Sequence, residues 1–211
     1  MTNQQYYSLM KPYEDAGRIL KARLETLNHS LYGAQAVYGP VHNIQSRVKS
    51  KMSLEEKLQR LGMTGSVANA RDRILDIMGL RVICYFVSDI ANLSAGLKKQ
   101  TDLVMIKERD YISAPKESGY RSYHLVLGIP VYYQDTMEYF PVEVQFRTMS
   151  MDFWACMEHR ICYKKNPQNR QRLVEEFQHY ARMMKEIEEE FEQYGEMEEH
   201  LSGSGQAANR R

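Results

Sequence analysis

Apolar residues recur at steps of three and four near both ends of the chain. From residue 4 to residue 31 this spacing predicts an amphipathic helix. From 168 to 200 the same spacing predicts a second long helix with a heptad seam. The seam consists of Leu173, Phe177, Tyr180, Met184, Ile187, Phe191 and Tyr194. These helices could pack onto the rest of the domain, but two seams are more apolar surface than a small sheet can cover. We therefore expect a subunit interface.

The middle of the chain predicts short strands and helices. Strands are expected at 44–49, 82–87, 103–110, about 120–133 and 139–147. Helices are expected from Ser53, which begins a capping box, to Gly62, from Ser88 to about 100, and over 149–165. Residues 62–70 are small and polar and are expected to form a loop. The buried stripe of the 149–165 helix is expected at Phe153, Trp154, Met157 and Ile161. These elements predict an α+β fold with a mixed sheet of about five strands, flanked by helices.

Length and composition indicate one cytoplasmic domain. The chain has 211 residues, 43% of them hydrophobic, and a net charge of +1, so no global field attracts it to nucleic acid or a membrane. The three cysteines form no CxxC pair, and no apolar stretch approaches the ~18 residues of a membrane span. We expect one domain over residues 1–200 with its core at about 40–165, and a disordered tail at 201–211.

A basic cluster follows the first helix. Arg47 and Lys49 lie two apart on an extended segment and share a face, and Ser53, Lys57 and Arg60 share a face of the next helix. All five can bind phosphate, and a helix N-terminus adds free N–H groups for an anion. A solvated basic surface is the alternative, but the convergence favours a phosphate site.

Two acidic positions lie beside strands. Asp76 precedes the apolar run at 82–87, where a carboxylate could bind a metal or pair with a neighbouring arginine. In the last strand Glu143, Gln145 and Arg147 alternate with apolar residues and so share one face. That face could be exposed to solvent, but we expect it to line a polar active site.

The stretch from Lys116 to Val126 combines groups that a nucleotide needs. Gly119 predicts a turn, Tyr120 offers an aromatic face, and Arg121 and His124 offer charge or hydrogen bonds. An ordinary loop and strand with half-buried tyrosines is the alternative to a nucleotide site.

Together these motifs resemble the small alarmone synthetases, the single-domain members of the RelA/SpoT homologue superfamily. The resemblance covers about residues 40–165. It rests on 47–60, 76–81 (DIMGLR), 108–111 (ERDY), 116–124, 143–148 (EVQFRT) and 153–159, in this order and at these spacings.

The resemblance implies a nucleotidyltransferase-like fold and transfer of pyrophosphate from ATP to the 3′-hydroxyl of GDP or GTP, which gives AMP and (p)ppGpp. It also implies Mg²⁺ and a homotetramer. Asp76 and Glu143 would hold Mg²⁺, and Glu143 would accept the 3′-OH proton. The ATP-binding residues would be Arg47, Lys49, Ser53, Lys57, Arg60 and Arg81, with the two arginines on the adenine. The GDP/GTP-binding residues would be Arg109, Lys116, Tyr120, His124, Gln145 and Asp152, with Tyr120 stacked on guanine.

Asp152 is expected to select guanine, because a carboxylate can accept hydrogen bonds from both donors on the guanine edge.

The chain contains no His-Asp dipeptide, so we expect synthesis without hydrolysis. Two other functions stay open. A related transferase would place pyrophosphate on the 3′ end of tRNA, for which the first helix offers Lys11, Arg18, Lys21 and Arg23. A catalytically dead nucleotide- or RNA-binding module is the other.

Overall fold

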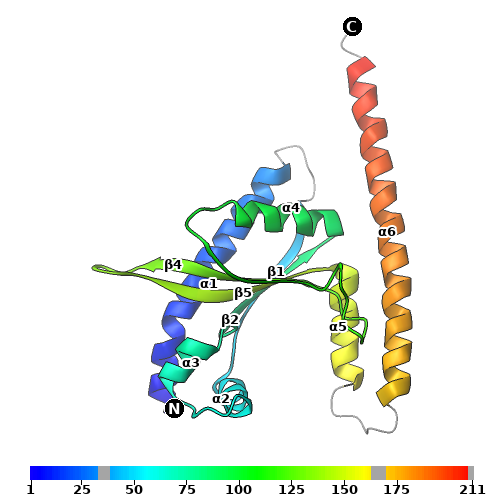
Figure 1. The fold of residues 1–211 in the computed structure, drawn as a ribbon. Helices are drawn as coiled ribbons and strands as arrows, with labels where there is room; N and C mark the ends of the chain where they lie inside the picture. The colour runs from blue at the N-terminus through cyan, green and yellow to red at the C-terminus, as the bar shows by residue number, and fades with distance from the viewer. Residues whose placement is uncertain (33–38, 163–169, 209–211) are drawn as a thin grey trace. The chain divides into compact units, whose positions relative to one another are not determined.

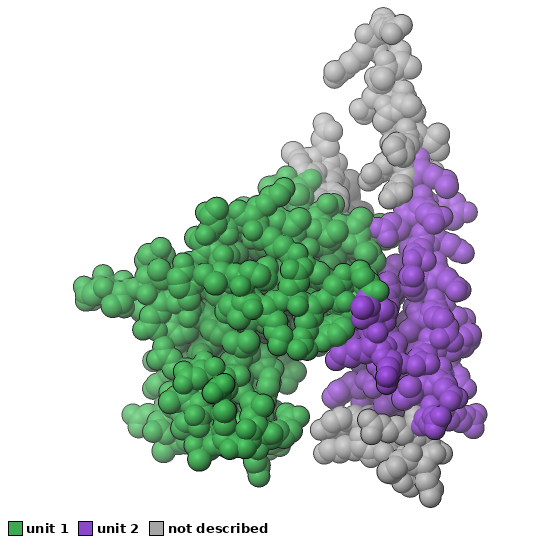
Figure 2. Space-filling view, viewed as in Figure 1, with its two compact units in different colours: residues 1–113, 122–148 green, residues 114–121, 149–211 purple. Residues whose placement is uncertain are grey.

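The computed structural model describes residues 1–32, 39–162 and 170–208 (Figure 1). The chain divides into two compact units, coloured separately in Figure 2. Unit 1 comprises residues 1–113 and 122–148, and unit 2 comprises 114–121 and 149–211. The last two helices and the loop at 114–121 form the second unit, and the expected single domain over 1–200 stays a prediction.

Unit 1 contains a five-stranded mixed sheet, which confirms the predicted α+β fold. Its strands are β1 (Val41–Val48), β2 (Met78–Cys84), β3 (Val104–Asp110), β4 (Tyr123–Tyr132) and β5 (Met137–Thr148). They lie in the order β1-β2-β5-β4-β3. Only β2 and β5 pair in parallel; the other three pairs are antiparallel.

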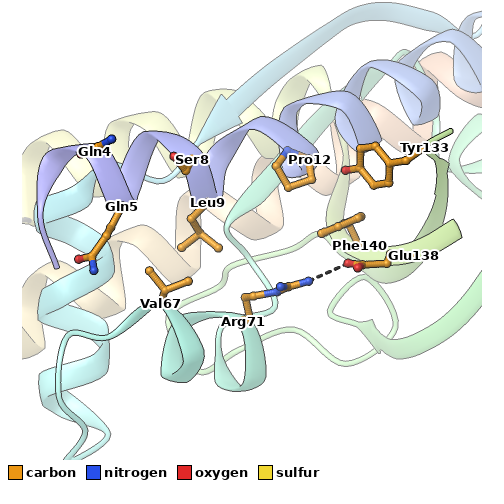
Figure 3. Close-up of a pocket in the computed structure, with 10 residues that line it drawn as sticks. All are labelled: Gln4, Gln5, Ser8, Leu9, Pro12, Val67, Arg71, Tyr133, Glu138 and Phe140. Carbon is orange, nitrogen blue, oxygen red and sulfur yellow. Dashed lines mark hydrogen bonds and ion pairs between the residues drawn. The ribbon is translucent and has the colours of Figure 1, made fainter. Parts of the chain in front are cut away.

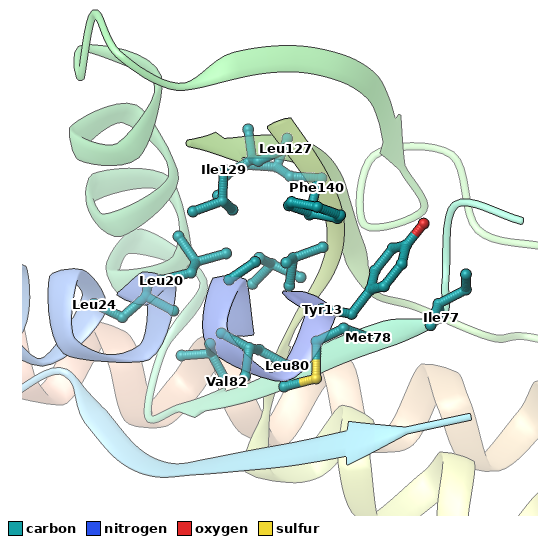
Figure 4. Close-up of a cluster of buried hydrophobic side chains, with 14 of the residues drawn as sticks. Tyr13, Leu20, Leu24, Ile77, Met78, Leu80, Val82, Leu127, Ile129 and Phe140 are labelled. Atoms are coloured by element: carbon teal, nitrogen blue, oxygen red, sulfur yellow. The ribbon is translucent and has the colours of Figure 1, made fainter. Parts of the chain in front are cut away.

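Helices cover one face of this sheet. Unit 1 has α1 (Asn3–Tyr32), α2 (Lys51–Arg60), α3 (Val67–Arg73) and α4 (Val87–Lys98). The 30-residue α1 confirms the predicted first helix, and it packs against α4 and the sheet (Figure 1). Figure 4 shows the core between them. Its labelled residues are Tyr13, Leu20, Leu24, Ile77, Met78, Leu80, Val82, Leu127, Ile129 and Phe140. Full burial of one such side chain is worth about 1.5–3 kcal/mol, so this face fixes the sheet against α1.

Strand alternation places polar side chains on the opposite face. Met78, Leu80 and Val82 point into the core, so Gly79 and Arg81 between them point to the other side. The register pairs Gly79 with Glu143 and Arg81 with Gln145. The same face therefore carries the polar row of β5, as predicted. We call it the open face.

Two predicted helix starts were wrong by a few residues. Ser50, not Ser53, caps α2: its side chain accepts a hydrogen bond from the Ser53 N–H. Ser88 lies inside α4, whose N-cap is Phe86, because Asp89 bonds the Phe86 N–H and begins the helix earlier. The predicted end of α2 is confirmed, since Gly62 has φ +71° and Met63 N–H bonds Leu58 C=O as in a Schellman cap.

Two further local predictions need correction. Residues 62–70 are not all loop, because Ser66 caps the short helix α3. The strand expected from about residue 120 begins only at Tyr123, after a turn in which Gly119 has φ +92°.

Unit 2 consists of α5 (Met149–Cys162), α6 (Arg170–Ala208) and the loop at 114–121. The two helices pack through Trp154, whose ring lies 5.7 Å from that of Phe177. Trp154 is buried as predicted, but Phe153 and Ile161 are exposed, because α6 covers only one side of α5 and Met151 takes the buried position. The α6 backbone also stays helical to Ala208, past the expected end at residue 200; a propagating helix tolerates each glycine at a cost of about 1 kcal/mol. Residues 209–211 lie outside the described residues.

Among the described residues, no helix combines the length and the apolar character that crossing a bilayer requires.

Candidate active site

A cavity of about 270 Å³ lies on the open face of the sheet. It is lined by Lys57, Arg73, Leu75, Asp76, Lys107, Arg109, His124, Val126 and Glu143. Asp76 comes from the segment before β2 and Glu143 from the neighbouring strand β5. The parallel pairing of these strands thus brings the two predicted catalytic carboxylates to one cavity.

Asp76 lies between two lysines. Lys57 Nζ is 2.8 Å from Asp76 Oδ1, and Lys49 Nζ is 3.0 Å from Oδ2. Burial raises the pKa of Asp76, but the hydrogen bond from Lys57 and the charge of Lys49 outweigh burial and hold this pKa below its usual value of 3.8. The aspartate is therefore ionised at neutral pH, and it holds both lysine side chains beside it, with Lys57 and Asp76 lining the cavity.

Glu143 is oriented by a chain of hydrogen bonds along β5. Arg147 Nη2 donates to Gln145 Oε1 over 3.1 Å, and Gln145 Nε2 donates to Glu143 Oε2 over 2.8 Å. His124 Nδ1 lies 3.6 Å from Glu143 Oε1. Burial raises the pKa of Glu143, but His124 and Gln145 together bring this pKa below its usual value of 4.5, against an opposing effect of Asp76. Because both carboxylates line the same cavity, each adds to the negative charge around the other.

The predicted adenine-binding arginines share the open face. Arg47 on β1 pairs with Gly79, and Arg81 on β2 pairs with Gln45. Arg47 is exposed and Arg81 half-buried. Gly79 lies beside Arg47, and a Cβ built there would meet nothing closer than 3.8 Å, so the sheet surface at this point is open. The remaining predicted ATP residues, Ser53 and Arg60, lie on α2, with Ser53 in its first turn and Arg60 exposed at its end.

The predicted acceptor residues divide between the two units. Arg109, His124 and Gln145 belong to unit 1, whereas Lys116, Tyr120 and Asp152 belong to unit 2. In unit 1, Arg109 and His124 are register partners on β3 and β4.

In unit 2, the Lys116 ammonium lies 5.0 Å from the centre of the Tyr120 ring. Asp152 is half-buried in the first turn of α5. Lys116 and Tyr120 therefore form one local group, and their role in recognising a base and a phosphate stays a prediction.

Three residues at this site were not predicted as ligands. Arg73 and Lys107 line the cavity, and Tyr111 accepts a 2.9 Å hydrogen bond from Arg109 while its ring meets His124 edge-on at 5.3 Å. Strand alternation could have identified Lys107, because it lies two residues before Arg109 on β3 and so shares its face. No sequence signal separated Arg73 from the other arginines around α3.

The donor set suits a hard cation only in part. Among the described residues, no three or more His, Cys, Asp or Glu side chains come together as metal ligands. Asp76 and Glu143 supply two carboxylates, and Mg²⁺ commonly takes one or two from the protein and the rest from phosphates and water. Two carboxylates on one cavity are compatible with Mg²⁺ that arrives with a triphosphate, and the Mg²⁺ implied by the resemblance stays a prediction.

A larger cavity of about 570 Å³ lies elsewhere in unit 1 (Figure 3). Residues of α1, α3 and the β4–β5 hairpin line it, including Leu9, Val67 and Phe140. Its two charged side chains, Arg71 and Glu138, neutralise each other at 2.7 Å. It therefore offers no uncompensated charge to a phosphate, and the smaller cavity is the better candidate.

Three of the four basic residues that the sequence offered on α1 form ion pairs with acidic side chains. Arg18 pairs with Asp15, Lys21 Nζ is 3.8 Å from Glu25, and Arg23 Nη2 is 2.5 Å from Asp102. These pairs weaken the predicted RNA-binding surface.

Comparison with known proteins places the chain in a family. Residues 46–168 match the family described as "Region found in RelA / SpoT proteins". The GTP pyrophosphokinase YwaC of Bacillus subtilis is 41% identical over 152 residues, which cover 72% of each chain. The GTP pyrophosphokinase YjbM of the same organism is 36% identical over 164 residues, or 78% of this chain and 76% of YjbM.

Solved structures agree with these relatives. Small alarmone synthetase 1 from Bacillus subtilis, bound to its product pppGpp, matches with a TM-score of 0.80 and 32% identity, over 93% of this chain and all of that one. Small alarmone synthetase 2 from the same organism matches with a TM-score of 0.78 and 34% identity, over 91% and 98% of the two chains. The family suggested by the sequence motifs is therefore confirmed, and this chain belongs to the RelA/SpoT family.

Proposed function

We propose that this protein is a GTP pyrophosphokinase that makes (p)ppGpp. It transfers the β,γ-pyrophosphate of ATP to the 3′-hydroxyl of GDP or GTP and releases AMP. The names of its relatives and the product bound to the related synthetase support this activity. The cavity that Asp76 and Glu143 share with a surrounding set of cations is the observation in this molecule that carries the proposal.

The donor nucleotide occupies the region of α2, β1 and β2. The guanidinium planes of Arg47 and Arg81 stack on adenine, a contact that a lysine could not replace. Lys49, Ser53, Lys57 and Arg60 bind the phosphates. Because Lys49 and Lys57 are already held as cations by Asp76, little ordering is required when the triphosphate arrives.

The acceptor nucleotide is held at its base by Tyr120 and Asp152, and at its phosphates and ribose by Lys116, Arg109, His124 and Gln145. The 3′-oxygen attacks the β-phosphorus of ATP, the bond from that phosphorus to the bridging oxygen of the α-phosphate breaks, and AMP leaves with that oxygen. Glu143 takes the 3′-OH proton. Its lowered pKa makes it a weak base, but in a loose transition state the proton departs late, when a weak base suffices.

Mg²⁺ bound by Asp76 and Glu143 would neutralise charge on the triphosphate oxygens. Lys49 and Lys57, which now pair with Asp76, would then be available to bind the phosphates.

One experiment tests the proposed function. The protein is incubated with Mg²⁺, ATP labelled at the γ-phosphate, and GDP, GTP or deacylated tRNA. Label in a guanosine tetra- or pentaphosphate, with AMP in equal amount, is the expected result. Label in tRNA would show the related transferase, and label in neither acceptor would show a binding module without this activity.

We also propose that the protein acts as a cytoplasmic homotetramer. Along α6, Tyr180, Ile187, Phe191 and Tyr194 are 43–68% exposed, although Phe177 of the same seam is buried. Light scattering after chromatography should give the mass of a tetramer, and Phe191→Glu should reduce that mass.

The cysteines Cys84, Cys156 and Cys162 are free thiols, as suits a reducing compartment.

A further inference from the structure

The loop at 114–121 belongs to unit 2, together with α5 and α6. This loop carries Lys116 and Tyr120, two of the proposed acceptor ligands. Its own backbone closes a tight turn, in which Gly119 N–H bonds Lys116 C=O over 2.8 Å and Lys116 N–H bonds Tyr120 C=O over 3.1 Å. The position of this turn therefore decides where both ligands lie.

Contacts with α6 hold the turn closely. Gly119 has φ +92°, and a Cβ built on it would lie 2.9 Å from Ala181 Cβ and 3.4 Å from Phe177 C=O. Gln178 of the same helix donates a hydrogen bond from Nε2 to the Glu117 carbonyl. Only glycine combines this backbone conformation with so close an approach to a helix.

A buried ion pair ends the loop. Arg121 Nη1 lies 3.1 Å from Glu188 Oε2, and the two side chains are only 8% and 5% exposed. Arg121 Nε and Glu188 Oε1 have no hydrogen-bond partner among the described residues. The pair therefore depends on one contact, and removal of either charge leaves the other buried without compensation.

The ring of Tyr120 is placed by the same unit. It meets the Trp154 ring at 6.4 Å and 61°, and Trp154 Nε1 donates a 2.8 Å hydrogen bond to Phe177 C=O on α6. A shift of the loop along α6 would therefore move the Tyr120 ring relative to Trp154.

We propose that Glu188 is a positioning residue for the acceptor nucleotide. Through Arg121 it fixes the register of the loop on α6, and so sets the aromatic face of Tyr120 and the ammonium of Lys116. This inference rests on the proposed function, which gives Tyr120 the guanine base. It assigns to α6 a part in acceptor recognition that is separate from the proposed subunit interface.

Kinetics of Glu188→Gln test the assignment. The substitution keeps the size of the side chain and removes its charge. We expect the KM for GDP to rise on the order of 10- to 100-fold while the KM for ATP stays within about 2-fold, since a misplacement of about 1 Å can cost that much. Glu190→Gln, an exposed position on the same helix, is the matched control and should leave both constants unchanged.

Direct binding separates this inference from the proposed function. Trp154 is the only tryptophan, so its fluorescence should report GDP bound beside Tyr120. A response in the native protein that Glu188→Gln shifts to higher GDP concentration supports the inference. A response equal in both proteins overturns the inference and leaves the proposed function intact. No GDP response and no labelled product in the native protein overturns the proposed function itself.

A second variant removes the dependence on one substitution. Gly119→Ala keeps the ion pair but forces the turn away from Ala181, so it should raise the KM for GDP in the same direction. If Glu188→Gln proves unfolded by circular dichroism, Gly119→Ala decides. An unchanged KM for GDP in a folded Gly119→Ala protein would show that the seating of the loop on α6 does not position the acceptor.

Discussion

Two sets of ion pairs in this molecule have opposite characters. Asp76, Lys49 and Lys57 keep 25%, 16% and 34% of their side-chain surface exposed, whereas Arg121 and Glu188 keep 8% and 5%. Charges of the first kind can exchange partners with an incoming ligand. Charges of the second kind lie away from water, and among the described residues the printed partner of each is the other. The first set therefore suits chemistry and the second suits placement, and their substitution should separate activity from stability.

Loss of a cavity carboxylate should have the largest effect on rate. Asp76→Asn or Glu143→Gln should lower kcat by about 10³-fold or more, because each removes a group that orients the reacting phosphates or accepts the proton. The measurement is the initial rate of labelled product at saturating ATP and GDP. Glu138→Gln, on the same strand as Glu143 but beside the other cavity, is the control and should retain its rate. A large fall in the thermal unfolding temperature of these variants would show that the carboxylates support the fold. The contrast with the buried ion pair would then not hold.

Loss of one buried partner should, besides its effect on the KM for GDP, lower the stability of the protein. Arg121→Gln leaves the Glu188 carboxylate buried and unpaired, which costs about 3–5 kcal/mol. Urea unfolding followed by Trp154 fluorescence measures this loss. The exposed Arg182→Gln on α6 should change the free energy of unfolding by less than about 0.5 kcal/mol. Equal stability of the two variants would mean that the buried pair contributes nothing to the placement of the loop.

Removal of one cavity lysine should show the exchange of partners. Lys57→Ala should raise the KM for ATP about 10-fold, since a charge-assisted contact to phosphate is lost while Lys49 remains. The KM for GDP should stay the same, and the exposed Lys11→Ala should alter neither constant. A rise in the KM for GDP alone would show that Lys57 binds the acceptor nucleotide and not ATP.

Guanine selection by Asp152 is a narrower test. Asp152→Leu removes both acceptors for the guanine edge and should raise the KM for GDP about 10-fold, with no change for ATP. Steady-state kinetics with each substrate varied in turn measures this. An unchanged KM for GDP removes Asp152 from the site.

The smallest effect concerns pH. The pKa of Asp76 is lower in the folded protein than in the unfolded chain, so its two lysine contacts stabilise the fold fully above pH 3.8. This contribution is lost only as pH falls below 3.8, through the folded value. Acid titration of the native protein and Asp76→Asn should give curves that differ above pH 3.8 and converge below it. Curves that stay parallel through this range would contradict the assignment.

Hydrophobic spacing was enough to predict most of the fold. The core positions of α1, such as Leu20 and Leu24, follow directly from steps of three and four. The alternation of β5 likewise placed Glu143 and Gln145 on one polar face. Periodicity could not show which side of α5 has a neighbour, so Phe153 was expected to be buried and is exposed.

The partner of a given group was harder to predict where two or more nearby residues could form the same contact. Ser50 and Ser53 lie three apart, both carry a hydroxyl, and only the geometry shows that the first caps the helix. In the same way, the sequence offered Asp76 several arginines as partners, whereas the fold gives it Lys49 and Lys57. Such pairings depend on where a strand begins, which no pattern of residue types determines.

Strand β3 forms one edge of the sheet, and all seven of its residues are exposed. An outer strand with unpaired backbone groups invites a second molecule to extend the sheet, and this can start aggregation. Here the pairing of β3 with β4 is irregular between Met105 and Lys107. The strand then ends in four consecutive charged residues, Lys107 to Asp110. Lys107 and Arg109, which line the cavity, are therefore also charges on an open sheet edge, where charged side chains disfavour pairing with a second strand.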